Sequence, residues 1–174
     1  MGTSRARHAL KPVVAFSFFF VLIGARIGPV RAEGACTGQD TRIVVELAQH
    51  RLFLCARDQA VESFDVRIGR GGPGKSRAGD GKTPVGTYVL GRPRASRRYG
   101  IFIPIGYPTA EQRRKGFTGG DIGVHGPDRR AKWLGRLVNT FASTYGCVGL
   151  AKDEEMERIA KWVRTAKART IELR

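Results

Sequence analysis

Apolar and polar positions alternate along two neighbouring stretches early in the chain, 41–47 and 52–55. A two-residue period places every second side chain on the same face of an extended strand. The polar pair Gln49-His50 separates the stretches, as a tight turn does. The pattern therefore predicts a β-hairpin with one apolar face, made by Ile43, Val45, Leu47, Leu52 and Leu54.

Further strands are predicted at 61–68, 87–90, 101–105 and 170–173, because short apolar runs there lie between glycine and proline clusters or polar residues. These segments make the chain mainly β. No internal repeat or interdomain linker is visible, so one domain is expected from residue 41 to residue 174.

A helix is predicted only near the C-terminus, between residues 153 and 166. Asp153 is a suitable N-terminal cap, and acidic residues follow it in the first turn. The apolar residues then recur with a helical period and form a single face. That face consists of Met156, Ile159, Val163 and Ala166.

The first 32 residues have the composition of an export signal. Basic residues precede an apolar run from Val13 to Ile23, and Val30-Arg31-Ala32 resembles a small-residue cleavage site. The run is shorter than the roughly 20 apolar residues that span a bilayer. We therefore expect a secretory signal peptide at 1–32 and a periplasmic or wall-associated mature protein. The alternative is an uncleaved N-terminal anchor.

The charge balance is strongly basic, with 31 Lys and Arg against 15 Asp and Glu, a net +16. Five of the basic residues and none of the acidic ones fall in 1–32, so an exported protein would keep +11. With 41% hydrophobic residues the chain can build a core, so this charge belongs to a folded surface. Outside the cell that surface favours anionic wall polymers, and no nucleic-acid partner is expected.

Three cysteines are an odd set for an oxidising compartment. Cys36 and Cys55 lie near the expected mature N-terminus, whereas Cys147 lies among glycines in a segment with other signs of chemistry. The favoured disulfide is therefore Cys36 with Cys55. The alternative is that all three are reduced and buried as small apolar residues.

The segment GRGGPGKS, residues 69–76, satisfies the phosphate-binding pattern G-x-x-x-x-G-K-S. That mechanism requires a helix directly after the glycines, whose amides hold the phosphate. The next residues are RAGDGKTPVG, too rich in glycine and proline to begin a helix. We interpret the segment as a basic loop and expect no nucleotide partner.

A cysteine and a histidine, each beside glycine, are the candidate catalytic pair. Cys147 needs a base to become a nucleophile, because the ordinary thiol pKa of about 8.5 leaves it protonated at neutral pH. His125 follows an apolar, strand-like stretch and precedes Gly126, whereas His50 lies in the predicted hairpin turn. His125 is thus the candidate base. A buried structural cysteine and a core histidine are the alternative interpretation.

Gly146 has a predicted role beside the nucleophile. A glycine there permits a tight turn and close approach of a substrate. The backbone amides of Tyr145, Gly146 and Cys147 are then candidates to stabilise a developing oxyanion.

The ordered motifs resemble the L,D-transpeptidase catalytic domain of the YkuD type. The resemblance rests on His125-Gly126, on Thr144-Tyr145-Gly146-Cys147, and on several flanking blocks, and it extends over Thr41–Arg174. The flanking blocks are IVVELAQHRLFLC, GDGKTPVGTY, IPIGYPTAEQRRKG, HGP and WLGRL. It implies an L,D-transpeptidase-like β-sandwich with a short C-terminal helix and minor helical insertions.

The resemblance also implies roles for single residues. Cys147 would attack the L,D bond of a peptidoglycan stem peptide, His125 would carry the proton, and Gly126 would orient the imidazole. Tyr145 and Gly146 would supply the oxyanion amides. Thr144 and Arg129 are candidate substrate contacts, and no metal or cofactor is implied. The basic clusters Arg113-Arg114-Lys115 and Arg129-Arg130-Lys132 are further candidates for binding stem carboxylates, with solvated surface charge as the alternative.

The chain departs from the commonest family motif, Ser-His-Gly-Cys followed two residues later by Arg or Asn. Here Tyr145 replaces the histidine and Gly149 replaces the cationic or amide residue. The segment is more similar to the branch with T-x-G-C-I-A-V, which includes enzymes that detach lipoprotein from peptidoglycan. A carboxypeptidase or amidase, with a wall-linked lipoprotein as partner, is therefore an alternative function. A non-catalytic cationic wall-binding module is another.

Overall fold

The computed structural model describes residues 1–2, 34–130 and 143–174. The expected signal peptide, apart from its first two residues, and the WLGRL block at 133–137 lie outside these ranges. Within them the fold is mainly β, with two mixed sheets and few helices, as the sequence predicts. No helix among the described residues has the length and apolar character needed to cross a membrane.

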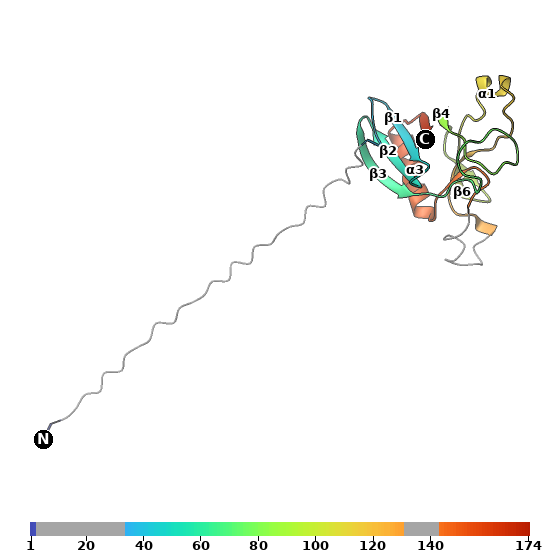
Figure 1. The fold of residues 1–174 in the computed structure, drawn as a ribbon. Helices are drawn as coiled ribbons and strands as arrows, with labels where there is room; N and C mark the ends of the chain where they lie inside the picture. Colours follow the sequence, from blue (N-terminus) through green and yellow to red (C-terminus); the bar gives the residue numbers. More distant parts are fainter. Residues whose placement is uncertain (3–33, 131–142) are drawn as a thin grey trace.

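The larger sheet has five strands in the order β3-β2-β1-β9-β4 (Figure 1). β1 (Thr41–Glu46), β2 (Arg51–Ala56) and β3 (Gln59–Asp65) form an antiparallel meander. β9 (Thr170–Leu173) pairs parallel with β1 and antiparallel with β4 (Gly86–Val89). The predicted hairpin, its turn and the closing strand are thus confirmed.

The smaller sheet has the order β5-β6-β7-β8. β5 (Arg94–Ser96), β6 (Gly100–Pro104) and β7 (Gly123–His125) are antiparallel neighbours. β8 (Val148–Gly149) lies parallel to β7. Sequence patterns missed β5 and β8, because two or three residues are too short to show a period.

One core joins the two sheets and the C-terminal helix α3 (Asp153–Thr165). The apolar face of α3 packs into it through Met156, Ile159 and Val163, as predicted. Asp153, however, is the first helical residue and not the cap. The N-cap is Lys152, which makes no side-chain capping bond.

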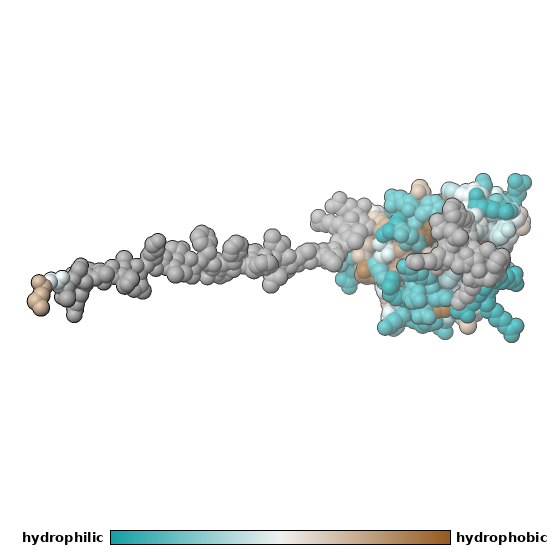
Figure 2. Space-filling model, turned by 90° about the horizontal axis from the view of Figure 1, so that it is seen from below, coloured by the Kyte–Doolittle hydropathy of each residue, from teal (hydrophilic) through white to brown (hydrophobic). Residues whose placement is uncertain are grey.

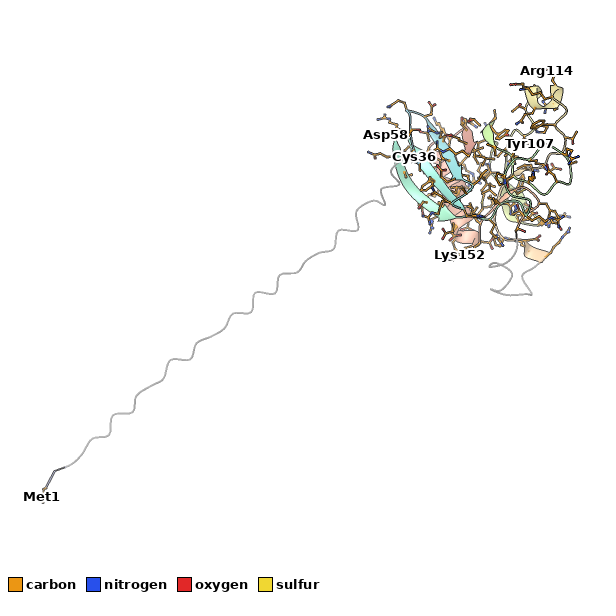
Figure 3. The ribbon with its side chains drawn as sticks, in the orientation of Figure 1. Met1, Cys36, Asp58, Tyr107, Arg114 and Lys152 are labelled. Atoms are coloured by element: carbon orange, nitrogen blue, oxygen red, sulfur yellow. A yellow bond between two sulfur atoms is a disulfide. The ribbon has the colours of Figure 1, made fainter. Side chains whose placement is uncertain are left out.

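The outer face of the five-stranded sheet carries a second apolar cluster. Val44, Phe53 and Cys55 point to this side, and Ala35 and Cys36 cover them. Cys36 and Cys55, the pair that the sequence favours, form a disulfide with their Cα atoms 5.5 Å apart. Cys36 therefore anchors the start of the domain to the sheet, on the left side of the folded domain in Figure 3.

A short helix, α1 (Ala110–Arg114), projects from the opposite end of the molecule (Figure 1). Thr109 and Gln112 form a capping box at its start. That T-x-x-Q signal is present in the sequence, although five residues cannot show a helical period. Hydrophilic side chains cover much of the coloured face in Figure 2, in keeping with the basic composition.

Candidate active site

The pairing of β7 with β8 brings the candidate histidine and cysteine into one region. His125 is the last residue of β7, and its partner in the parallel register is Gly149. Cys147 lies directly before β8. The Cys147 Sγ lies 3.5 Å from the carbonyl oxygen of Asp121, just before β7. The two candidates, separated along the chain, thus flank the same pair of strands.

His125 is buried and held in one orientation. Its Nδ1 lies 2.7 Å from the carbonyl oxygen of Gly126. A carbonyl oxygen only accepts, so Nδ1 carries the proton and Nε2 keeps a free lone pair. The ring of Tyr99 stacks on the imidazole, with centroids 3.8 Å apart. The imidazole is therefore presented as a neutral base.

The electrostatics keep both groups uncharged at neutral pH. Burial lowers the pKa of His125 to about 4, and the positive charges of Arg67 and Arg98 act in the same direction. Burial also raises the pKa of the Cys147 thiol, against an opposing hydrogen bond from the Gly123 amide. The resting pair is therefore thiol and imidazole, and the proton must move as the sulfur attacks.

Thr144 organises the turn that carries the cysteine. Its hydroxyl donates to the carbonyl oxygen of Cys147 at 2.5 Å and accepts from the amide of Gly146 at 3.1 Å. The Thr144 hydroxyl, predicted to contact substrate, is thus engaged inside the turn. The Gly146 amide, predicted to hold an oxyanion, is occupied by the same hydroxyl in this structure.

Gly146 is required by its conformation and by its neighbours. Its φ is +129°, outside the range that residues with a Cβ adopt readily. A Cβ on Gly146 would also lie 2.6 Å from the carbonyl oxygen of Lys82. The loop before β4 therefore packs directly beneath the cysteine turn.

Asp80 holds that supporting loop together. Its carboxylate accepts from Lys75 Nζ at 2.8 Å and from the amides of Ser76 and Arg77, each at 2.9 Å. The amide of Lys82 donates to it at 3.1 Å. This network occupies the place where a phosphate-binding protein would begin a helix, so GRGGPGKS lies in a loop, as predicted.

The ion pair in this loop is buried, with 4% of the Lys75 side chain and 11% of the Asp80 side chain exposed. Burial alone would raise the pKa of Asp80. The hydrogen bonds from Lys75 and the loop amides outweigh it and hold that pKa well below its ordinary range. The carboxylate is thus charged throughout the physiological range.

Tyr145 projects outward beside the cysteine, with 67% of its surface exposed. The guanidinium of Arg70 lies 4.6 Å from the centre of its ring. Arg70 is tied to the same turn, because its amide donates to the carbonyl oxygen of Thr144. The two side chains make a cationic and aromatic rim at this edge of the site.

The other predicted residues lie elsewhere. Arg129 Nη2 lies 4.0 Å from the Asp153 carboxylate at the start of α3. His50 is exposed in the β1-β2 turn. Lys115 pairs with Glu111 on α1, and Arg114 marks the outer end of that helix in Figure 3. Lys132 lies outside the described residues.

Three residues near the pair were not singled out by sequence patterns: Arg67, Arg98 and Tyr99. The charges of both arginines act on His125, and the ring of Tyr99 covers it. Arg98 is itself held by Asp128, with Nη2 at 2.6 Å from the carboxylate. The run Arg97-Arg98-Tyr99 directly before a predicted strand could have indicated that a cation and an aromatic ring lie near the site. Only the strand register shows which of these side chains faces the site.

Within the described ranges, no group of His, Cys, Asp and Glu side chains is placed to hold a metal ion. A cavity of about 530 Å³ does open between β4 and α1. Its lining includes Lys75, Thr87, Glu111 and Lys115. The cavity touches the supporting loop through Lys75 and does not include His125 or Cys147.

A family model for the YkuD L,D-transpeptidase catalytic domain matches residues 40–171. Among solved structures, the helical cell shape determining protein Pgp2 from Campylobacter jejuni is similar at 22% identity and a TM-score of 0.59, over 75% of this chain and 46% of Pgp2. Bd1075 from Bdellovibrio bacteriovorus is similar at 22% identity and a TM-score of 0.53, over 75% of this chain and 46% of Bd1075.

An L,D-transpeptidase from Enterococcus faecium, solved as a C442S mutant, shares 13% identity and a TM-score of 0.51. That match covers 79% of this chain and 50% of the enterococcal chain. This chain therefore spans half or less of the length of these proteins. No curated protein matches its sequence significantly. At these identities the likeness establishes the fold.

Proposed function

Because this chain belongs to the YkuD family of L,D-transpeptidase catalytic domains, we propose that it is a cysteine acyltransferase acting on peptidoglycan stem peptides. The proposal assigns the chemistry to Cys147 and His125. It also places the protein outside the cytoplasm, where such peptides occur, in agreement with the basic, apolar start of the chain.

In the first half-reaction the Cys147 sulfur attacks the carbonyl of the L,D bond between the third and fourth residues of the stem. The thiol proton passes to Nε2 of His125 as the carbon–sulfur bond forms. When the carbon–nitrogen bond breaks, His125 returns that proton to the leaving amine. The products are a thioester on Cys147 and free D-alanine.

In the second half-reaction an acceptor resolves the thioester. The amine of another stem would give a 3→3 cross-link, and water would give hydrolysis. His125 takes the acceptor's proton and returns it to the departing sulfur, which restores the resting pair. Amides of the turn, with Tyr145 and Gly146 as candidates, would stabilise the oxyanion. Gly146 must release the Thr144 hydroxyl to do so.

The orientation of His125 is the observation that carries this proposal. The hydrogen bond from Nδ1 to the Gly126 carbonyl oxygen leaves Nε2 as an acceptor. A histidine kept only for packing has no need of a defined tautomer beside a partly exposed cysteine. The pairing of β7 with β8, in which Val148 directly after Cys147 lies opposite Val124 directly before His125, supports a shared role for the two groups.

The test is incubation with tetrapeptide muropeptides followed by mass analysis. Loss of D-alanine with formation of 3→3 dimers supports transpeptidation, and loss without dimers supports a carboxypeptidase. Cys147→Ala should abolish both, and an active Cys147→Ala variant contradicts the proposal. Release of lipoprotein from sacculi without dimers points to an amidase. Salt-sensitive sacculus binding with no product points to a wall-binding module.

A further inference from the structure

Three residues from distant parts of the chain lie side by side at the β8 edge of the four-stranded sheet. Arg67 and Gly149 exchange two backbone hydrogen bonds of 2.8 Å as a short antiparallel bridge. Gly149 is also the register partner of His125. Directly paired residues point to the same face of a sheet. Arg67 and His125 therefore share a face, with a residue between them that has no side chain.

The glycine leaves the gap between the cation and the imidazole open. A Cβ on Gly149 would lie 3.1 Å from Thr144 Cγ2, 3.4 Å from His125 Cε1 and 3.8 Å from Arg67 Nε, so the Thr144 methyl group borders this gap. Any side chain at this position would separate the two groups. Arg67 lies close enough to His125 for its positive charge to lower the pKa of the imidazole.

The guanidinium of Arg67 is only partly satisfied. Its Nη2 donates to the carbonyl oxygen of Leu150 at 2.9 Å. Its Nε is buried and has no hydrogen-bond partner within the described ranges. A buried donor without a hydrogen-bond partner is destabilising. Such a group calls for an explanation, and its place next to a candidate catalytic base makes a ligand contact one candidate.

The other cations that act on the candidate pair are already neutralised. Arg98 is held by Asp128, and Lys75 is held by Asp80. None of the ion pairs in the described part of the chain includes Arg67. It is therefore the cation near His125 whose charge is available for an anionic group of a substrate.

We propose that Arg67 is a specificity residue that binds the terminal carboxylate of the residue leaving as an amine. The inference rests on the proposed function. His125 protonates the leaving amine, and the carboxylate of a C-terminal amino acid is one carbon away from that amine. Arg67 lies across Gly149 from the same imidazole, and a guanidinium matches a carboxylate in shape and charge.

The arrangement favours stems that end in a free carboxylate over longer or capped peptides. It also couples recognition to proton transfer. The unpaired charge of Arg67 opposes protonation of His125. A bound carboxylate offsets that charge, so the imidazole becomes a stronger base once the correct substrate is in place. Arg67 thus acts on both binding and basicity.

The test compares two tetrapeptide substrates that differ only at the C-terminus, D-alanine and D-alaninamide. Release of the terminal residue is measured by mass spectrometry. The wild type should prefer the acid by about 10–100-fold in kcat/KM, the range for one charged hydrogen bond. Arg67→Gln should lose activity on the acid alone, so that the preference falls below about threefold. Arg67→Lys, which keeps the charge without the planar fork, should retain part of it.

Arg164→Gln is the matched control, because it removes the same charge from the exposed side of α3. It should keep the wild-type preference. Thermal unfolding and alkylation of Cys147 verify that each variant is folded. If Arg67→Gln lowers activity on both substrates equally, Arg67 is structural and the inference is wrong. If the wild type releases neither residue, the proposed function fails, and the inference fails with it.

Discussion

The ring of Tyr99 stacks on the imidazole of His125, with centroids 3.8 Å apart and 24° between their planes. Tyr99 precedes β6, and His125 ends β7, so the contact joins two strands of the smaller sheet. The contact covers one face of the candidate base. It contributes to the burial that keeps the imidazole neutral.

Removing that ring should loosen and hydrate the imidazole. Tyr99→Ala is expected to lower kcat on tetrapeptide by about tenfold or more, because small losses of orientation are costly in acid–base catalysis. Tyr99→Phe keeps the stacked ring and should stay within about threefold of the wild type. Steady-state kinetics of the two variants checks this, and equal losses in both would assign the effect to the hydroxyl.

The pH dependence should reveal the buried histidine. Its folded pKa of about 4 lies below the ordinary 6.5, so the neutral base persists well into the acid range. We expect kcat/KM to be flat from about pH 5.5 to neutrality and to fall only toward pH 4. In Tyr99→Ala the acidic limb of the kcat/KM profile should shift to higher pH, because water reaching the imidazole of His125 lessens the cost of charging it. A wild-type limb near pH 6.5 would contradict this assignment.

Asp80 should contribute strongly to stability. Asp80→Asn removes one partner of a buried ion pair and is expected to lower the free energy of unfolding by about 3 kcal/mol. The matched control is Asp65→Asn, whose side chain is 88% exposed in its pair with Arg51. It should cost less than about 1 kcal/mol. Urea unfolding of both variants measures the difference, and equal effects would contradict the structural role of the loop.

The same carboxylate predicts a pH dependence of stability. The folded pKa of Asp80 is depressed below its ordinary value of 3.8. Its contribution is therefore complete above that value and is lost as the pH falls below it toward the folded pKa. Unfolding curves from pH 5 down to pH 2 should lose less stability in Asp80→Asn than in the wild type. Parallel loss in both proteins would contradict this.

Gly146 should tolerate no side chain. Gly146→Ala combines a strained φ of +129° with a Cβ 2.6 Å from the Lys82 carbonyl oxygen. We expect a loss of about 2 kcal/mol in stability and a large loss of thiol reactivity, because the cysteine turn must move. Gly120→Ala is the control, since its added Cβ meets nothing within 4 Å. Alkylation rates of Cys147 report the outcome, and an unchanged rate in Gly146→Ala would refute it.

Periodicity in the sequence was enough to place the hairpin, the closing strand and the apolar face of α3. These features repeat locally, so every second or every third to fourth residue carries the signal. It was not enough for β5 and β8, which are too short to repeat. The sequence pattern also assigned Asp153 to the N-cap of α3, whereas Asp153 is the first helical residue. Capping depends on which backbone amide a side chain reaches, and periodicity does not show this.

The sequence by itself determined the candidate chemistry: one cysteine and one histidine beside glycines, a favoured disulfide between the other two cysteines, and a basic chain suited to an anionic partner. Only the tertiary structure decided how those groups are used. It engages the Thr144 hydroxyl inside the turn, turns Arg129 toward Asp153, and sets Arg67 beside His125 across Gly149. The physical reason is strand register, which pairs residues that no local pattern in the chain connects.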